Sequence, residues 1–137
     1  MFNIRYITEN DIGFWLTLDK HLSDSDVRQK IRDKQGYVIS DDDKPMGVMR
    51  YNLFWDNTPF LNLISIEETY RGKGYGKKGM AHWENEMRSF GYKFVMTSTQ
   101  SDELGQFFYR KIGYSECGCL ILDNEPLEIL LKKNINT

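Results

Sequence analysis

The sequence reads Tyr70-Arg71-Gly72-Lys73-Gly74-Tyr75-Gly76 at the point where a strand pattern gives way to a helix pattern. The preceding segment, 60–66, is apolar at all but two positions, which is typical of a strand near the centre of a sheet. In the segment 80–90, apolar residues recur at spacings of three and four, as on one face of a helix, and Gly91 follows as its stop. The glycine-rich stretch is therefore expected to be the turn that opens this helix.

A turn of this kind can hold an anion. The first backbone N–H groups of a helix have no partner within the helix, and the helix dipole adds partial positive charge there. The glycines of the turn lack side chains, so an anion can approach the backbone closely. Four cationic side chains surround the turn: Arg71, Lys73, Lys77 and Lys78. Because cations at a helix N-terminus are unfavourable by themselves, the pattern predicts an anion bound among them.

The spacing excludes two other phosphate-binding motifs. A P-loop needs four residues between its first glycine and a Gly-Lys-Ser/Thr, which the segment 77–79 does not supply. The dinucleotide fingerprint Gly-x-Gly-x-x-Gly is matched by Gly72 and Gly74, but its third glycine is replaced by Lys77. A solvated turn without a ligand stays open as the plain alternative from this stretch alone.

Two segments together resemble a known family. Arg71-x-x-Gly74-x-Gly76 resembles the Gln/Arg-x-x-Gly-x-Gly/Ala signature of the GNAT superfamily of N-acetyltransferases. Phe107-Phe108-Tyr109-Arg110-Lys111-Ile112-Gly113-Tyr114 resembles the Phe-Tyr-x-Lys-x-Gly-Phe element of the same family. The elements between the two motifs follow in the family's order, and the resemblance extends over 61–114. It implies the GNAT fold, an α+β (α/β mixed) fold with a mixed, mostly antiparallel sheet of about seven strands and about four flanking helices.

The rest of the chain fits this fold class. Patterns of alternation and turn residues predict strands at 3–7, 37–40, 46–54, 93–98, 114–121 and 127–131. Helices are expected from Thr8, with Asp11 as its capping partner, from Ser23, with Asp26, and over 103–111. No repeat or linker interrupts the chain, so 1–137 is expected to form one domain.

Composition limits the partners of the protein. The formal net charge is −2, which gives no sign of a nucleic-acid partner. No apolar run is long enough to span a bilayer and the N-terminus does not resemble a secretory signal, so we expect a soluble, cytoplasmic protein without a membrane partner. Cys117 and Cys119 are too close to cross-link distant segments and lack zinc-site spacing, so they are expected to be reduced and buried, with no metal.

The family resemblance implies acetyl-CoA as co-substrate. Its pyrophosphate would be held by backbone amides of Arg71, Gly72, Lys73, Gly74, Tyr75, Gly76 and Lys77. Ile66, by its spacing from the signature, would offer an amide to the thioester oxygen as a small oxyanion hole. Tyr109 matches the general acid that protonates, or hydrogen-bonds to, the leaving sulfur. Asp102 stands where relatives often have an Asn that contacts the cofactor.

The base and the acceptor site are less defined in the sequence. The strand at 93–98 has no carboxylate, so Glu67 and Glu68 at the end of the preceding strand are the candidate bases, with solvated loop charges as the alternative. The first two helices and the turn after 46–54 are rich in aromatic residues. Trp15, Tyr51 and Trp55 are the candidates for contact with the acceptor, although residues of these types are more often part of the core than of a pocket.

These observations lead to an expected function and one alternative. The expected function is an acetyl-CoA-dependent N-acetyltransferase that moves an acetyl group to a primary amine of a small molecule or peptide by direct attack on the thioester. The alternative is a non-catalytic sensor or interaction module of the same fold that binds coenzyme A. The last two strands are candidates for pairing across a homodimer. The sequence does not identify the amine acceptor.

Overall fold

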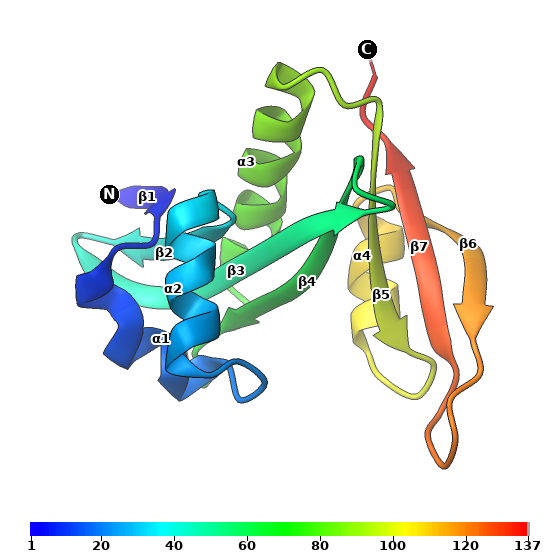
Figure 1. Ribbon diagram of the computed structural model, residues 1–137, viewed down its shortest axis with the longest axis horizontal. Coiled ribbons are helices and arrows are strands. Elements are labelled where there is room, and N and C mark those ends of the chain that lie inside the picture. The colour runs from blue at the N-terminus through cyan, green and yellow to red at the C-terminus, as the bar shows by residue number, and fades with distance from the viewer. Residues whose placement is uncertain (137) are drawn as a thin grey trace. The chain divides into compact units, whose positions relative to one another are not determined.

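The fold is built on a mixed sheet whose strands follow the order β1-β2-β3-β4-β5-β7-β6 in a computed structural model that describes residues 1–136 (Figure 1). The strands are β1 (Phe2–Tyr6), β2 (Gly36–Asp41), β3 (Lys44–Phe54), β4 (Thr58–Ile66), β5 (Phe94–Gln100), β6 (Ser115–Leu120) and β7 (Glu128–Asn134). The helices are α1 (Ile12–Leu18), α2 (Asp24–Asp33), α3 (Tyr75–Ser89) and α4 (Gly105–Lys111), with 3-10 turns η1 (Glu9–Asp11) and η2 (Glu68–Tyr70). No helix within 1–136 is both long and apolar enough to span a bilayer.

The sheet has the predicted mixed character. β1, β2 and β3 pair antiparallel, β4 and β5 pair parallel, and β7 pairs antiparallel with both β5 and β6. β4 is the middle strand of the order, as its apolar sequence predicted. The α+β fold class inferred from the sequence is therefore confirmed. The chain divides into two compact units, Met1–Asn52 with Asn62–Trp83 and Leu53–Leu61 with Glu84–Thr137, which are described separately.

In the first unit, alternate residues of β2 and β3 face different helices. Val38 and Val48 are buried in one core cluster with Trp15 of α1 and Val27 of α2. The residues of opposite parity meet α3: the ring of Tyr37 lies 6.0 Å from that of His82, and the ring of Tyr51 lies 5.8 Å from that of Trp83. Because side chains alternate along a strand, helices cover both faces of these two strands.

Local sequence signals set the ends of the first elements. Thr8 and Asp11 form the predicted capping pair, with the Thr8 amide donating to Asp11 Oδ2 at 2.8 Å. Ser23 and Asp26 cap α2 reciprocally, since each backbone amide donates to the other side chain, at 3.0 and 3.3 Å. These short-range bonds satisfy amides that a helix start leaves without partners.

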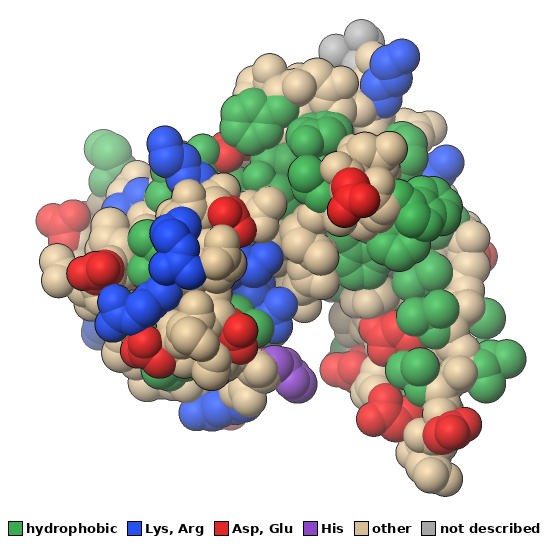
Figure 2. Space-filling view, viewed as in Figure 1, with side chains coloured by type: hydrophobic (Ala, Val, Ile, Leu, Met, Phe, Trp, Pro, Cys, Tyr) green, Lys and Arg blue, Asp and Glu red, His purple; other side chains and the backbone are tan. Residues whose placement is uncertain are grey.

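The second unit is held together by an ionic network as well as by its strands. Glu84 is buried, and its carboxylate accepts hydrogen bonds from Tyr114 Oη at 2.8 Å and from Lys133 Nζ at 2.7 Å. The segment between β6 and β7 is exposed, and Figure 2 shows hydrophobic and acidic side chains gathered along this part of the unit. The large exposed hydrophobic residues here are Leu120 at the end of β6 and, in the segment that follows, Ile121, Leu122 and Leu127.

Two predictions of burial are wrong. Cys117 and Cys119 are both exposed, because they lie in β6, which is the last strand of the sheet order and is exposed along its length. The register between β6 and β7 also shifts at Cys117, between Glu116 and Gly118. The apolar helix face expected over 80–90 includes Phe90 as its last residue, but α3 ends at Ser89 and the Phe90 side chain is exposed.

Candidate active site

The glycine-rich stretch forms the entry to α3, as the sequence predicted. Between η2 and α3 the backbone passes through Gly72 at φ +76° and Gly74 at φ +88°, which are conformations that other L residues rarely adopt. Chain neighbours aside, no atom of the described residues lies within 4 Å of a Cβ built at either glycine. The turn thus exposes its backbone at both positions.

The amides at the start of α3 are available as donors to an anion. The first hydrogen bond of the helix runs from the Lys78 amide to the Gly74 carbonyl at 3.1 Å. The amides of Tyr75, Gly76 and Lys77 precede this bond, so they have no acceptor within the helix. Because α3 is 15 residues long, its dipole adds positive potential at the same point.

Gly74→Ala should lower the free energy of unfolding by about 1–2 kcal/mol, because alanine pays the steric cost of a left-handed backbone. The surroundings add no further penalty, since the added Cβ meets only open space. Urea denaturation measures the difference. Gly13→Ala is the matched control: Gly13 lies within α1 with equally open surroundings and no positive φ, so alanine should stabilise there. Equal effects at both sites would contradict the strained turn.

Arg71 ties the turn to the end of β4. Its Nε donates a hydrogen bond to the Ile66 carbonyl at 2.8 Å, and the side chain is otherwise exposed. Lys73 lies beside the Tyr70 ring, with Nζ 5.8 Å from the ring centroid. Two of the four cationic side chains predicted around the turn, Arg71 and Lys73, are therefore positioned by contacts within the first unit.

Tyr75, the first residue of α3, is fixed by residues that sequence reasoning missed. Its hydroxyl donates to Asp41 Oδ2 at 2.9 Å, which raises the pKa of the Tyr75 phenol. Its ring stacks on Phe2 at 5.9 Å, and Lys78 Nζ lies 5.0 Å from the Phe2 ring. No local pattern links these positions, because they meet only when β1, β2 and α3 are assembled.

The predicted oxyanion-hole and base residues lie together at the end of β4. Ile66 is the last residue of β4 and is half-buried, as is Glu67 after it. The Glu67 amide donates to the Met46 carbonyl at 2.8 Å, which holds this end of the strand beside β3. Glu68 is exposed and begins η2. The first unit thus brings Ile66, Glu67 and Glu68 next to the turn in sequence and structure.

Tyr109 and Asp102 belong to the second unit. Tyr109 lies in α4 and is buried, with its ring 5.3 Å from Phe108 and 5.7 Å from Tyr114. Burial raises the pKa of the Tyr109 phenol, while a hydrogen bond with Thr97 of β5 acts in the opposite direction. The phenol is therefore protonated at neutral pH, the form that a general acid requires. Asp102 is exposed in the turn between β5 and α4.

The three aromatic candidates for the acceptor site differ in exposure. Trp15 is completely buried in the core cluster, and its Nε1 donates to Asp19 Oδ2 at 3.1 Å. Tyr51 is also buried, with its ring against Trp83. Trp55, in the second unit, is 76% exposed and lies in a turn with φ +55°. Of the three, Trp55 is the one that presents a large surface to solvent.

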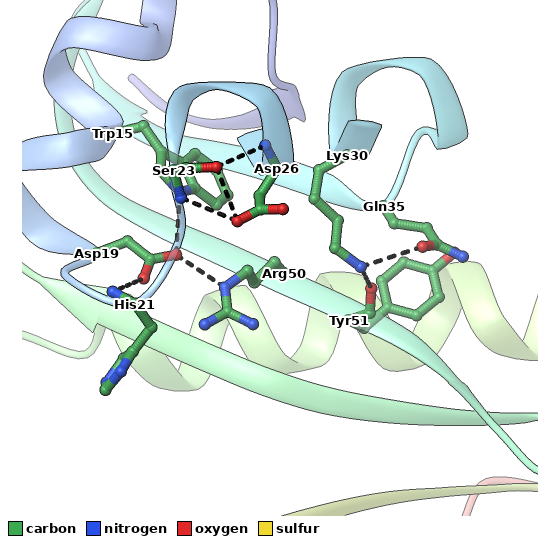
Figure 3. A network of polar contacts seen from close by, with 9 residues as sticks. All are labelled: Trp15, Asp19, His21, Ser23, Asp26, Lys30, Gln35, Arg50 and Tyr51. Atoms are coloured by element: carbon green, nitrogen blue, oxygen red, sulfur yellow. Dashed lines mark hydrogen bonds and ion pairs between the residues drawn. The ribbon is translucent and has the colours of Figure 1, made fainter. Parts of the chain in front are cut away.

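A buried ion pair in the first unit was not anticipated. Asp19, which follows α1, accepts a hydrogen bond from Arg50 Nε of β3 at 2.7 Å (Figure 3). The Asp19 side chain is completely buried and that of Arg50 is 11% exposed. A signal existed in the sequence, since Arg50 is the single charge in the otherwise uncharged run 46–51. Within 1–136, no group of three His, Cys, Asp or Glu side chains is arranged to hold a metal ion.

Comparison with known proteins places the chain in a family. The model of the acetyltransferase (GNAT) family matches residues 5–114, so the chain belongs to this family. No curated protein sequence matches the chain significantly.

Solved structures share the fold over nearly the whole chain. A GNAT-family acetyltransferase from Bacillus cereus ATCC 10987 is 23% identical, with a TM-score of 0.78 over 98% of this chain and 97% of that one. The ribosomal-protein-S18-alanine N-acetyltransferase from Escherichia coli is 14% identical, with a TM-score of 0.83 over 100% and 96%. A GNAT acetyltransferase from Elizabethkingia anophelis with acetyl-CoA bound is 18% identical, with a TM-score of 0.78 over 97% of each chain. At these identities the likeness shows the fold alone.

Proposed function

We propose that this protein is an acetyl-CoA-dependent N-acetyltransferase that moves an acetyl group to a primary amine of a small molecule or peptide. The observation that carries the proposal is the backbone of the turn before α3, with two left-handed glycines and amides free of helical partners. A pyrophosphate, which is compact and doubly charged, suits such a cluster of N–H donors. The solved relatives support it, because one has acetyl-CoA bound and another is an alanine N-acetyltransferase.

The residues of the turn would hold the cofactor through its pyrophosphate. The donors would be the backbone amides of Arg71, Gly72, Lys73, Gly74, Tyr75, Gly76 and Lys77, of which the Arg71 amide already donates to the Glu68 carbonyl at 3.2 Å. The side chains of Arg71 and Lys73 add positive charge, and contacts with Ile66 and Tyr70 already position them. Asp102 is a further candidate contact. The group bound here supplies an acetyl carbon activated as a thioester.

Residues of the protein would stabilise the negative charge that forms on the thioester oxygen and would transfer the protons of the reaction. The Ile66 amide would donate to the oxygen that becomes negative as the amine attacks. Tyr109 would deliver its proton to the departing sulfur, and its raised pKa keeps that proton in place until then. Glu67 or Glu68 would take the proton that the amine loses, directly or through water. Of the three aromatic candidates for the acceptor side, Trp55 offers an exposed ring, whereas Trp15 and Tyr51 are buried.

Tyr109→Phe should lower kcat by about 100-fold, the lower end of the contribution of a general acid, with coenzyme A affinity nearly unchanged. Acetyl-CoA is incubated with a panel of primary amines and the released thiol is measured. Tyr92→Phe is the matched control, because it removes a half-buried phenol from the same unit and should leave the rate unaltered. An unchanged kcat in Tyr109→Phe would remove Tyr109 from the mechanism.

The same assay separates the enzyme from a binding module. Thiol release with at least one amine supports the transferase. Tight binding of coenzyme A without release on any amine would favour the non-catalytic sensor, for which the absence of a carboxylate on β5 leaves room.

A further inference from the structure

Arg50 is fixed through one side of its guanidinium only. Its Nε donates to Asp19 Oδ2 at 2.7 Å. Asp19 also accepts from Trp15 Nε1 and from the His21 amide, each at 3.1 Å, so its carboxylate is held from several directions. These donors belong to α1 and the loop after it, so they fix the position of the Asp19 carboxylate. The hydrogen bond from Nε to this fixed carboxylate then restricts the rotation of the Arg50 side chain. The orientation of its guanidinium is thereby set by the fold.

The other side of the guanidinium has no partner in the described part of the chain. No hydrogen bond or ion pair joins Arg50 Nη1 or Nη2 to any of the residues 1–136. Figure 3 shows both terminal nitrogens pointing away from Asp19. The whole residue is only 9% exposed, yet neither terminal nitrogen is a buried atom without a partner, so both reach the surface, where water or a ligand can accept their N–H groups. Two adjacent N–H-bearing nitrogens are thus presented, fixed and unused, at the edge of the buried region.

The chemistry of this fork selects its partner. Two parallel N–H groups of an arginine match the two oxygens of a carboxylate, and the rigid partner on Nε reduces the entropy lost on binding. The surroundings are also cationic: Lys30 Nζ is half-buried and bonded to neutral oxygens, the Tyr51 carbonyl at 2.7 Å and Gln35 Oε1 at 3.2 Å. Burial, and then the charge of Arg50, lower the pKa of Lys30. The pKa of Asp26 is lowered by its hydrogen bonds with Ser23 and, to a smaller extent, by the charge of Arg50. The Asp26 carboxylate, however, accepts its hydrogen bonds from Ser23.

We propose that the terminal nitrogens of Arg50 bind a carboxylate of the acceptor, so that the preferred acceptors are primary amines that also carry a carboxylate. The proposal rests on the proposed acetyl transfer and specifies its substrate class. Arg50 lies beside Tyr51 and the loop of His21, in the region of the sequence expected to meet the acceptor. Arg50 would therefore determine which acceptors bind, and it is given no role in the transfer of the acetyl group.

The test uses acceptors in matched pairs. Amino acids and dipeptides are offered as the free carboxylate and as the carboxamide, and kcat/KM is measured by thiol release. The parent should prefer the carboxylate members about 10- to 100-fold, through KM, as expected for a charge-assisted hydrogen bond. Arg50→Lys, which keeps a charge opposite Asp19 but loses the fork, should abolish most of this preference. Arg32→Lys makes the same change at an exposed arginine of α2 and should keep it.

A second measurement is independent of turnover. The Nε–H resonance of Arg50 in ¹⁵N-labelled protein should shift on titration with the carboxylate probes, in the presence of coenzyme A, and not with the carboxamides. Preserved coenzyme A affinity in Arg50→Lys establishes that the variant is folded. Turnover without preference, or an unmoved Arg50 resonance, overturns the proposal. If coenzyme A binds but no amine is acetylated, the proposed function fails, and the titration alone still decides whether Arg50 is a carboxylate site.

Discussion

Asp19→Ala should lower the free energy of unfolding by about 3–5 kcal/mol, as expected when one partner of a buried ion pair is removed. The carboxylate is completely buried and faces Arg50 at 2.7 Å. Without it, a buried guanidinium loses its counter-charge, and the donors of Trp15 and of the His21 amide lose their acceptor. The cost comes mainly from these stranded groups and not from the attraction of the pair itself. Denaturation in urea measures it.

Two variants show whether the stranded charge is the cause. Asp24→Ala removes a carboxylate that also meets an arginine at 2.7 Å, but both partners are exposed, so the loss should be far smaller. The double variant Asp19→Leu with Arg50→Met removes both charges and should recover much of the stability lost in Asp19→Ala. If the double variant is as unstable as the single one, the packing around Asp19 matters and the charge does not.

The pH dependence of stability should change in the same variant. Burial alone would raise the pKa of Asp19, but the hydrogen bonds from Arg50, the His21 amide and Trp15 outweigh it and lower the pKa overall. A carboxyl with a lowered folded pKa stabilises the protein fully above its unfolded pKa of about 4, and this stabilisation is lost as the pH falls through the folded value. Between about pH 5 and pH 3 the parent should therefore lose stability more steeply than Asp19→Ala.

The features that sequence predicted correctly depend on neighbours in the chain. The capping pairs Thr8/Asp11 and Ser23/Asp26 are three residues apart, and the same spacing appears in their hydrogen bonds. The break between the strands expected at 37–40 and 46–54 is a turn at Asp42 and Asp43, both at positive φ, which aspartate tolerates better than most residues. The glycines before α3 belong to the same class. Caps and turns can be predicted from sequence because a few neighbouring residues restrict the backbone to a small number of conformations.

The features that sequence missed depend on distant partners. Asp19 and Arg50 are 31 positions apart, and the sequence around neither residue predicts that the two will pair. The exposure of the cysteines follows from the sheet order, in which β7 lies between β5 and β6 and leaves β6 at the end. Trp15 has the aromatic character expected of an acceptor contact, but its position at the centre of the α1–α2 core decides its burial. Residue type alone does not separate these roles.

Arg71→Glu should weaken the binding of coenzyme A by about 100-fold, because the substitution removes a charge-assisted donor and places a carboxylate beside the pyrophosphate. Arg71 stands at the start of the turn, just before the amides of 75–77 that the helix leaves free. The hydrogen bond from its Nε to the Ile66 carbonyl at 2.8 Å is also lost, so the turn is held less firmly to β4. Calorimetric titration with coenzyme A gives the affinity, and the difference should shrink as salt is added.

Pantetheine provides the discriminating ligand for this prediction, since it keeps the thiol arm of coenzyme A and has no pyrophosphate. If the turn binds the pyrophosphate, Arg71→Glu weakens coenzyme A alone and leaves the affinity for pantetheine as in the parent. Arg32→Glu makes the same reversal of charge on α2 and should alter neither affinity, which separates a local effect from a change in net charge. Equal weakening of both ligands would mean that the substitution has disturbed the fold around β4. An unchanged affinity for coenzyme A would place its pyrophosphate away from the turn, and the free amides at the start of α3 would then need another ligand.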